Sequence, residues 1–418
     1  MKVLLINPNR YMFPPVPPIG LEYIAGALIS AGNKAEILDL CFSENIFKEI
    51  DNAIDLFKPD ITGITVRNID SALFLNNEFF LNEIRDIVKH IKENCGLKVI
   101  IGGAGTISCP KDILEYLDSD FIISGPAEGS INYVLEQINS NTNNKIFYGT
   151  CTSGLKINRI ISGINYNKYL EKGGIAGFET HKGCSSSCCY CIEANTKVFF
   201  KEISDVINEI KELINIGCSH FHLCDSEFNE SLEYCLDFCN ALKQENLNIK
   251  WTAYMKPDNF NKKLFQLMKE TGAYLITLTV DTYKKCDMYW SDIERFLFSA
   301  KSTGIKVAVD LLTGFPYEKE QEIKQHLENI RRPLPESINI NTYIRLYKNT
   351  RISKQIISDK NLHKYLIYYS NDENLIKPVF YNHINLEQLS QIVEFDPIFR
   401  IDGADKGVNY NRLENIAT

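Results

Sequence analysis

The segment GCSSSCCYC, residues 183–191, follows an apolar strand pattern and indicates what fold the second half of the chain adopts. Its cysteines Cys184, Cys188 and Cys191 have the spacing C-x3-C-x2-C. Three thiolates this close on one loop can each ligate one iron of a 4Fe–4S cluster. Three protein ligands leave the fourth iron open, and an open metal position is where catalysis occurs.

Two other sites remain open for this loop. His181 lies three residues before Cys184 and would complete a four-ligand zinc site. Cys188 and Cys191 alone would form a C-x2-C redox pair, which leaves Cys184 and Tyr190 unexplained. Most of the thirteen cysteines are scattered and, without a secretory signal, are expected to be reduced, buried thiols.

Around and beyond this loop, strand patterns alternate with helix patterns. The strands lie near GFETHKGC, HFHLCDS, IKWTAYM, YLITLTV, IKVAVDLLTG and SININ, and the helices over 201–216, 232–244, 261–271, 293–303 and 319–330. Six such units predict an α/β fold, a partial (β/α)6 barrel over 173–340. The irregular residues 341–418 predict a small C-terminal cap with scattered aromatics: Tyr343, Tyr347, Phe380, Tyr381, Phe399 and Tyr410.

The first 140 residues show a second alternation. Strand patterns at KVLLINP, KAEILDL, ITGITV, KVIIGGAG and FIISG are separated or followed by helix patterns over 21–31, 46–57, 77–94 and 128–138. This predicts a doubly wound parallel sheet over 1–140, followed by a polar linker over 141–172. The first strand runs into Asn7-Pro8-Asn9-Arg10 without a GxGxxG turn, so an NAD site is not expected.

The overall charge restricts the partners. The chain of 418 residues has 45 Lys+Arg against 53 Asp+Glu, a formal net charge of −8. Proteins that bind nucleic acids normally present a basic surface, so no nucleic-acid partner is expected. The amino-terminal apolar run indicates a buried strand instead of a signal peptide, and no run reaches the roughly 18 residues of a membrane helix. These observations predict a cytoplasmic protein.

The cysteine spacing, with an aromatic residue directly before the third cysteine, resembles the radical S-adenosylmethionine (SAM) superfamily. The resemblance implies that SAM binds the open iron and is cleaved to a 5′-deoxyadenosyl radical, with the backbone of Tyr190 against the adenine. Polar residues at the ends of barrel strands are candidate SAM contacts, although each could be an ordinary polar residue of the fold. They are Asp225, Ser226, Glu227, Lys256, Asp281 and Gly314, of which Asp225 and Glu227 are the preferred catalytic residues.

The first domain resembles the Rossmann-like cobalamin-binding domain that is fused to one large class of radical SAM enzymes. The residues that carry this resemblance follow predicted strands or precede the first helix, and they are Pro17, Pro18, Gly20, Arg67, Asn68, Asp70, Gly102, Gly103, Ala104, Gly125, Pro126 and Glu128. The DxHxxG motif that supplies a histidine to cobalt is absent, which implies base-off cobalamin with Arg67 or a neighbour beneath the cobalt, and Arg67 as a further catalytic residue. Arg67 could instead form a surface ion pair.

Together, the two resemblances predict a cobalamin-dependent radical SAM enzyme, with methyl transfer to an unactivated carbon as the leading reaction. A small molecule or peptide of secondary metabolism is the expected substrate, and flavodoxin or ferredoxin the expected one-electron reductant. Rearrangement, ring contraction, aminocarboxypropyl transfer and methylation without a radical use the same cofactors and stay open. So does a non-catalytic metal- or cobalamin-binding protein. A tRNA methylthiotransferase is disfavoured because the C-terminal tail is not basic.

Overall fold

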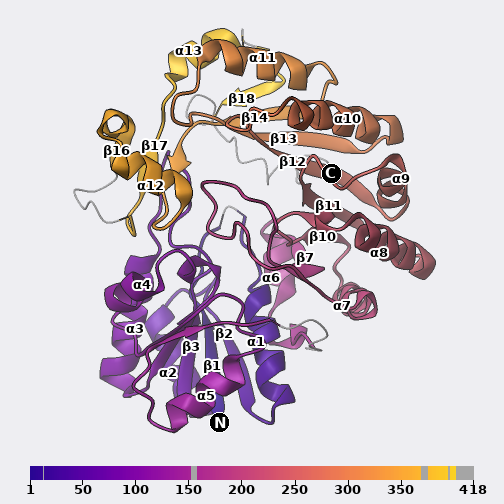
Figure 1. Ribbon diagram of the computed structural model, residues 1–418. Helices are drawn as coiled ribbons and strands as arrows, with labels where there is room; N and C mark the ends of the chain where they lie inside the picture. Colours follow the sequence, from indigo (N-terminus) through magenta and orange to yellow (C-terminus); the bar gives the residue numbers. More distant parts are fainter. Residues whose placement is uncertain (13, 152–157, 369–374, 394–395, 402–418) are drawn as a thin grey trace. The chain divides into compact units, whose positions relative to one another are not determined.

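The computed structural model describes residues 1–418 except 13, 152–157, 369–374, 394–395 and 402–418. The chain divides into two compact units (Figure 1). The amino-terminal unit comprises residues 1–72, 77–177 and 199–218. The barrel unit comprises residues 73–76, 178–198 and 219–418.

A parallel six-stranded sheet forms the centre of the amino-terminal unit. Its strands are β1 (Lys2–Asn7), β2 (Lys34–Asp39), β3 (Ile61–Thr65), β4 (Val99–Gly102), β5 (Phe121–Ser124) and β6 (Ile146–Tyr148). They pair in the order β2-β1-β3-β4-β5-β6, so the chain reverses its direction of progress between β1 and β3. Ligands of such sheets bind at this switch point, outside the carboxyl ends of the strands. The predicted parallel sheet is confirmed.

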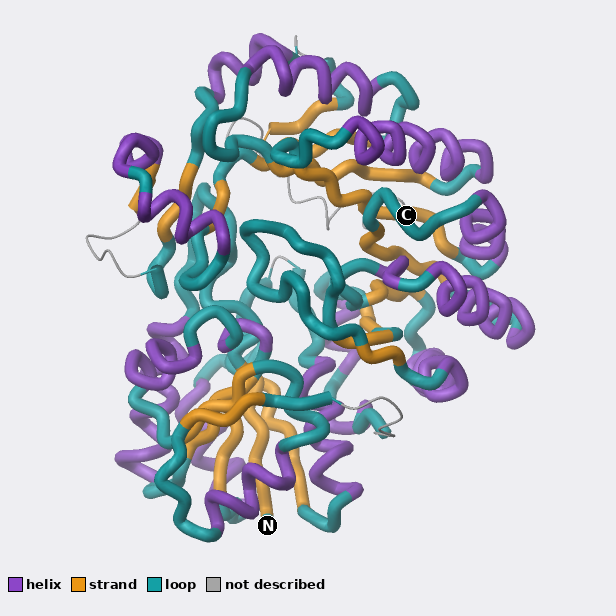
Figure 2. Tube along the Cα trace, viewed as in Figure 1, coloured by secondary structure: helices purple, strands orange, loops and turns teal. Residues whose placement is uncertain are grey.

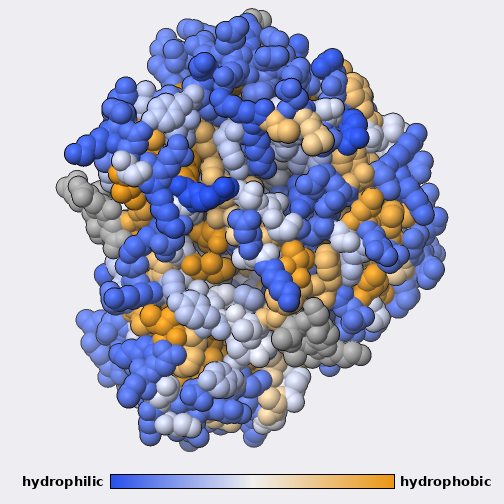
Figure 3. Space-filling view, viewed as in Figure 1, coloured by the Kyte–Doolittle hydropathy of each residue, from blue (hydrophilic) through white to orange (hydrophobic). Residues whose placement is uncertain are grey.

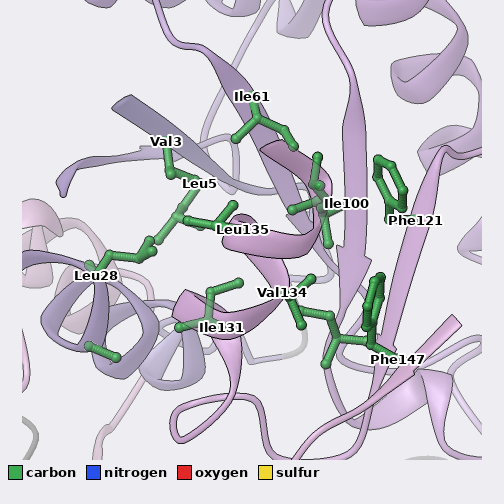
Figure 4. Packing of buried hydrophobic residues seen from close by; sticks show 14 of the residues in the cluster. Val3, Leu5, Leu28, Ile61, Ile100, Phe121, Ile131, Val134, Leu135 and Phe147 are labelled. Atoms are coloured by element: carbon green, nitrogen blue, oxygen red, sulfur yellow. The ribbon is translucent and has the colours of Figure 1, made fainter. Parts of the chain in front are cut away.

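The helices of this unit cover both faces of the sheet. They are α1 (Ile19–Ser30), α2 (Ile46–Phe57), α3 (Leu81–Cys95), α4 (Pro110–Leu117) and α5 (Ile131–Asn139). Alternate strand residues point to opposite faces, so Val3 and Leu5 of β1 enter the core shared with α1 and α5 (Figure 4). Helix α5 supplies one apolar face to this core, with Ile131, Val134, Leu135 and Ile138.

Part of this unit differs from the prediction. Helix α4 was not expected, because its eight residues are too few for a clear helical period, although Pro110 at its start is a typical helix-opening residue. The segment predicted as a linker contains β6, the short helix α6 (Tyr166–Glu171) and a 3₁₀ turn, η2 (Ile161–Gly163). These elements are short and depend on tertiary contacts that a local sequence pattern does not show.

The contact that fixes this segment is a buried ion pair. Arg159 Nε donates to Glu22 Oε2 of α1 at 2.8 Å, and both side chains are fully buried. Arg159 also donates to the carbonyl of Gly177 at 2.7 Å, and the Tyr166 hydroxyl lies 2.9 Å from Glu22 Oε2. Within the described part of the chain, the side chains that donate to the Glu22 carboxylate, Arg159 and Tyr166, both come from the segment after β6.

Arg159→Met should lower the free energy of unfolding by about 3–5 kcal/mol, because it leaves Glu22 buried without its cationic partner. Lys243→Met is the matched control, because it removes an ion pair with Glu270 in which both side chains are about half exposed. It should cost less than about 1 kcal/mol. Urea denaturation of the full chain, followed by circular dichroism, measures both. Equal costs for the two variants would contradict this account.

The barrel unit contains a curved sheet with helices on its outer side (Figure 1). The sheet order is β18-β14-β13-β12-β11-β10-β7. Its strands are β7 (Ala176–Phe178), β10 (His220–Leu223), β11 (Lys250–Met255), β12 (Ala273–Asp281), β13 (Lys306–Leu312), β14 (Ser337–Asn341) and β18 (Phe399–Ile401). Its helices are α8 (Leu232–Glu245), α9 (Lys262–Glu270), α10 (Asp287–Thr303) and α11 (Glu320–Arg331). The six predicted barrel strands are present, and β18 adds a seventh.

Shorter elements complete the fold. The strands β8 (His181–Lys182) and β9 (Phe199–Phe200) flank the cysteine loop in sequence, and α7 (Ile203–Asn215) follows β9 as part of the amino-terminal unit. Three 3₁₀ turns are η1 (Ala104–Thr106), η3 (Phe228–Glu230) and η4 (Lys360–Tyr365). No helix among the described residues is long and apolar enough to cross a membrane. On the face drawn in Figure 3, hydrophobic residues form small separate patches in a mostly hydrophilic surface.

The C-terminal segment is more regular than predicted. An antiparallel sheet of β15 (Ile344–Arg345), β17 (Val379–Tyr381) and β16 (Leu366–Tyr368) lies beside α12 (Arg351–Ser358), and α13 (Leu386–Ile392) precedes β18 (Figure 2). These elements enclose their own hydrophobic core, which includes Leu346, Ile352 and Tyr381. The strands have only two or three residues each, too few to show alternation in the sequence. The predicted position 410 lies outside the described residues.

Candidate active site

The cysteine loop is closed at its base by backbone contacts. Gly183 has φ +89°, and a Cβ there would lie 2.1 Å from the carbonyl oxygen of Lys197, so only glycine fits. The Cys184 N–H donates to Thr196 Oγ1 at 2.8 Å, and the Thr196 N–H donates back to the Cys184 carbonyl at 3.0 Å. The residues from 184 to 196 therefore form a closed loop.

The three motif thiols fit an iron–sulfur cluster by their chemistry. Cys184 is buried, Cys188 and Cys191 are partly buried, and none is in a disulfide. Burial raises the pKa of all three thiols, that of Cys191 to about 11 and that of Cys188 to about 12. Without metal they are protonated, and iron binding would displace the protons. Three unbridged thiols on one closed loop suit three irons of a 4Fe–4S cluster.

The neighbouring cysteine has a different environment. Cys189 packs against the core of the C-terminal segment that contains Phe315 and Ile352. Its backbone N–H donates to the Tyr283 hydroxyl at 3.3 Å, and its carbonyl accepts from the Ile352 N–H at 3.0 Å. Cys189 therefore joins the loop to the C-terminal segment, which agrees with the assignment of Cys188 and not Cys189 to the motif.

Asp225 holds the chain just before the loop. Its Oδ1 accepts from the backbone N–H of Thr180 at 2.8 Å and of His181 at 3.3 Å. Its Oδ2 accepts from the Thr180 hydroxyl and lies 3.2 Å from His181 Nδ1. Asp225 is thus a positioning residue in this structure. Among the described residues, His181 forms no group with the motif thiols in which the ligand atoms lie within 4.8 Å of one another.

The ion pair of Glu230 and Lys256 stabilises the cysteine loop at Ser185. The Glu230 carboxylate accepts from the Ser185 N–H at 3.1 Å and from its hydroxyl at 2.5 Å. Lys256 Nζ lies 3.1 Å from Glu230 Oε2, and both side chains are at least nine-tenths buried. Lys256 is therefore already engaged by a carboxylate. Ser226, another predicted SAM contact, donates to Glu193 Oε2 at 3.0 Å.

Asp281 joins the cysteine loop to the end of β12. Its Oδ1 accepts from the Tyr190 hydroxyl at 2.8 Å, and its Oδ2 lies 3.7 Å from Cys188 Sγ. Lys284 Nζ lies 3.0 Å from the same Oδ2. The predicted residues Tyr190 and Asp281 are thus brought together beside one of the motif thiols.

Glu227 is the most strongly perturbed acid near these residues. Burial raises its pKa to about 8, while a hydrogen bond from Thr279 and the charges of Lys256 and Lys284 oppose the rise. Its Oε1 accepts from Thr279 Oγ1 at 2.6 Å, and its buried Oε2 meets no hydrogen-bond partner in the described part of the chain. The carboxyl is largely neutral at neutral pH and can donate or accept a proton there.

The loop after β13 is fixed by an acid that sequence reasoning missed. Glu318 Oε2 accepts from the N–H of Gly314 at 2.7 Å and of Phe315 at 3.0 Å. Gly314 has φ +90°, and a Cβ there would lie 2.6 Å from the carbonyl oxygen of Thr342. The backbone N–H of Gly314, a predicted SAM contact, therefore already donates a hydrogen bond to Glu318. The only sequence signal was an acid four residues after the glycine.

The barrel sheet presents one polar face. Strand pairing places Leu278, Val309 and Ile338 in one row and Thr279, Asp310 and Asn339 in the next. Adjacent rows point to opposite faces, so the apolar rows pack against helices and the polar rows line the inner side of the curved sheet. Other members of the polar face are Tyr254, Thr277, Asp281, Ser337 and Asn341.

The predicted cobalamin residues lie at strand ends of the amino-terminal unit. Arg67 and Asn68 are exposed after β3, Gly102 ends β4 and is followed by Gly103 and Ala104, and Gly125 and Pro126 follow β5. Pro17 and Pro18 precede α1, and Gly20 is in its first turn. Two acidic residues of the predicted set are buried: Asp70, which accepts from the Ala72 N–H at 2.8 Å, and Glu128.

This edge suits a broad ligand with amide groups. A Cβ at Gly20 or Gly102 would meet no atom within 4 Å, so backbone is open there. A Cβ at Gly103 would lie 2.5 Å from the Val66 carbonyl oxygen, so the loops after β3 and β4 approach closely. No histidine occurs among residues 1–89, so none lies in the loops that directly follow β1, β2 and β3.

Two family models match separate segments of the chain. The B12 binding domain family matches residues 13–134, and the Radical SAM superfamily matches residues 178–330. The chain belongs to the cobalamin-dependent radical SAM enzymes.

Methyltransferases are prominent among the relatives of this radical SAM enzyme. The tryptophan 2-C-methyltransferase of Streptomyces laurentii is 20% identical over 78% of this chain and 70% of its own length. An uncharacterized methyltransferase of Pyrococcus horikoshii is 23% identical over 94% of this chain and 91% of its own. The structure of TsrM from Kitasatospora setae, a radical SAM methyltransferase with cobalamin and a 4Fe–4S cluster bound, has a TM-score of 0.83 at 19% identity and covers 100% and 95% of the two chains. The predicted combination of a cobalamin-binding domain with a radical SAM domain is confirmed.

Replacing any one motif cysteine of this radical SAM enzyme should prevent cluster assembly, because the two remaining thiolates are too few ligands to retain a 4Fe–4S cluster. After anaerobic reconstitution, Cys184→Ala, Cys188→Ala and Cys191→Ala should bind little iron. Cys189→Ala is the matched control and should keep about four irons per chain. Iron and sulfide analysis measures both. Loss of iron in Cys189→Ala but not in Cys188→Ala would show that the ligand assignment is wrong.

The raised pKa of Glu227 should make stability fall with pH. Its folded pKa of about 8 lies above the ordinary value of 4.5, so between these limits the folded chain binds more protons than the unfolded chain. Rising pH therefore removes stability, at up to about 1.4 kcal/mol per pH unit. Glu227→Gln should flatten this slope between pH 5 and about 8. Urea melts of the cofactor-free chain at several pH values test this, and identical slopes would contradict it.

Proposed function

We propose that this radical SAM enzyme methylates an unactivated carbon of a small polar molecule or a short peptide. The observation that carries the proposal is a closed loop of three free thiols, bordered by buried Glu227, Lys256 and Asp281, at the edge of a sheet with a polar inner face. When bound, the cluster and SAM supply a carbon radical and the corrinoid supplies the methyl group. The chain itself supplies ligands, orientation and proton control.

The residues of the barrel unit take distinct roles. Cys184, Cys188 and Cys191 ligate iron. Asp225 and Glu230 position the loop through its backbone. Glu227, with an unpaired buried oxygen among the described residues, meets a polar group of SAM or substrate. A neutral carboxyl there can donate to an anionic or carbonyl oxygen, which an ionised one could not do.

Arg67 is the proposed residue near the lower face of base-off cobalamin. It is exposed after β3, on the side of the switch point where a ligand binds, and no histidine is available nearby in sequence. A fixed guanidinium charge disfavours further positive charge on a neighbouring metal centre. The arginine would therefore favour a corrinoid without a lower ligand.

The inner face of the barrel favours a substrate with several hydrogen-bonding groups. Asn341 Nδ2 donates to Asp310 Oδ1 at 2.5 Å. In the adjacent position, both amide atoms of the buried Asn339 lack hydrogen-bond partners within the described chain. An unpaired buried amide costs about 1–3 kcal/mol, which a polar ligand would offset. An amino acid or peptide has such groups, and one relative is a tryptophan methyltransferase.

The reaction also needs an external electron donor. We propose a flavodoxin or ferredoxin, because each SAM cleavage consumes one electron. We also propose that the enzyme works in the cytoplasm, where the reducing environment preserves both free thiols and a cluster.

The direct test is anaerobic incubation of the reconstituted enzyme with SAM and a strong reductant, with and without cobalamin. 5′-Deoxyadenosine should form with either sample, because uncoupled cleavage needs only the cluster. S-Adenosylhomocysteine should require cobalamin as methyl acceptor, and Cys184→Ala should lose the deoxyadenosine. Liquid chromatography with mass spectrometry measures both products. S-Adenosylhomocysteine without any 5′-deoxyadenosine would contradict the radical mechanism and favour polar methyl transfer.

A further inference from the structure

Three side chains of different metal-binding types meet where α2 and α3 pack together in the amino-terminal unit. Asp51 Oδ1 of α2 lies 2.7 Å from His90 Nε2 and 3.7 Å from Cys95 Sγ, both in α3. One ligand atom of each lies within 4.8 Å of the other two. We propose that this group, the α2–α3 site, binds Zn²⁺.

The donor set suits zinc. Imidazole nitrogen, thiolate sulfur and carboxylate oxygen are the three ligand types that Zn²⁺ uses in proteins. Bonds of about 2.0–2.3 Å in a tetrahedral site separate the donors by roughly 3.3–3.8 Å. The Asp51–Cys95 separation already lies in this range, and the Asp51–His90 pair must widen by about half an ångström. The Asp51 side chain is 49% exposed, so water can reach the fourth position.

A neighbouring amide supports the histidine. Asn94 Nδ2 lies 2.9 Å from His90 Nδ1, on the ring edge away from Asp51. Ligating histidines usually donate their second ring N–H to a neighbouring acceptor, which fixes the ring. When zinc takes Nε2, the proton moves to Nδ1, and the Asn94 amide, turned over, accepts it with its oxygen. The partner required of a zinc-bound histidine is therefore in place.

The surroundings are negative. Burial, Asp51 and Asp55 raise the pKa of the Cys95 thiol, so it is protonated without metal. A divalent cation reverses this balance, because it offsets the carboxylate charge and stabilises the thiolate. The α2–α3 site is in the amino-terminal unit, whereas the cysteine loop is in the barrel unit. Its zinc would join two helices of the cobalamin domain and take no part in the radical chemistry.

The test uses the full-length enzyme with its cluster assembled, so that the motif cysteines are occupied by iron. The protein is incubated with Zn²⁺, passed over a chelating resin and analysed for metals. It should retain about one zinc per chain, with one sulfur neighbour at about 2.3 Å and otherwise nitrogen or oxygen in zinc X-ray absorption. No retained zinc, no sulfur neighbour or three sulfur neighbours would each overturn the proposal, the last by placing the metal on the cysteine loop.

Near-isosteric variants locate the metal. Cys95→Ser and His90→Gln should each weaken zinc retention at least about tenfold, and Asn94→Ala should weaken it about tenfold through the histidine. Cys109→Ser, which changes a buried thiol of the same unit outside the α2–α3 site, is the control and should retain zinc. Circular dichroism verifies that each variant is folded. Unchanged zinc in folded Cys95→Ser and His90→Gln would leave Asp51–His90 as an ordinary hydrogen bond between helices and overturn the proposal.

Discussion

Two buried carboxylates set the geometry on which the cluster site depends. Asp225 accepts hydrogen bonds from two backbone N–H groups just before the cysteine loop. Glu230 accepts hydrogen bonds from the backbone N–H and the hydroxyl of Ser185 within the loop. Both acids follow β10, so the end of one barrel strand fixes both sides of the first ligand, Cys184. Hydrogen bonds to charged acceptors are roughly twice as strong as neutral ones, which suits them to holding a loop that must receive a metal cube.

Burial also controls protonation around the loop. The motif thiols are protonated without iron, and Glu227 is largely neutral, because desolvation penalises the charged forms. Cluster binding therefore exchanges protons for iron, so the three buried thiolate charges form only when a metal is present to offset them. The amino-terminal unit follows the same plan of parallel strands, with its candidate ligand residues after β3, β4 and β5, beside the switch point of the sheet.

Local sequence patterns predicted the main elements of the fold but not the contacts between residues distant in the sequence. The strand and helix alternation predicted both parallel sheets, and the cysteine spacing predicted the cluster loop. Pairing between distant residues was not predictable: Arg159 lies in a polar segment that reads as a linker, and only its ion pair with Glu22 shows that the segment is folded. Likewise, nothing in the sequence distinguishes Glu230 and Glu318 from other acids, and the ion pair of Glu230 with Lys256 was not predicted. Such contacts arise from tertiary packing and leave no periodic signal.

The central claim is that the loop leaves one iron free to bind SAM. Electron–nuclear double resonance of the reduced cluster, with SAM labelled with ¹⁵N at its methionine amino group, tests this most directly. The account predicts a hyperfine coupling from the labelled nitrogen that is absent with unlabelled SAM. A cluster spectrum that the label leaves unchanged, in a sample shown to have bound SAM, would contradict it.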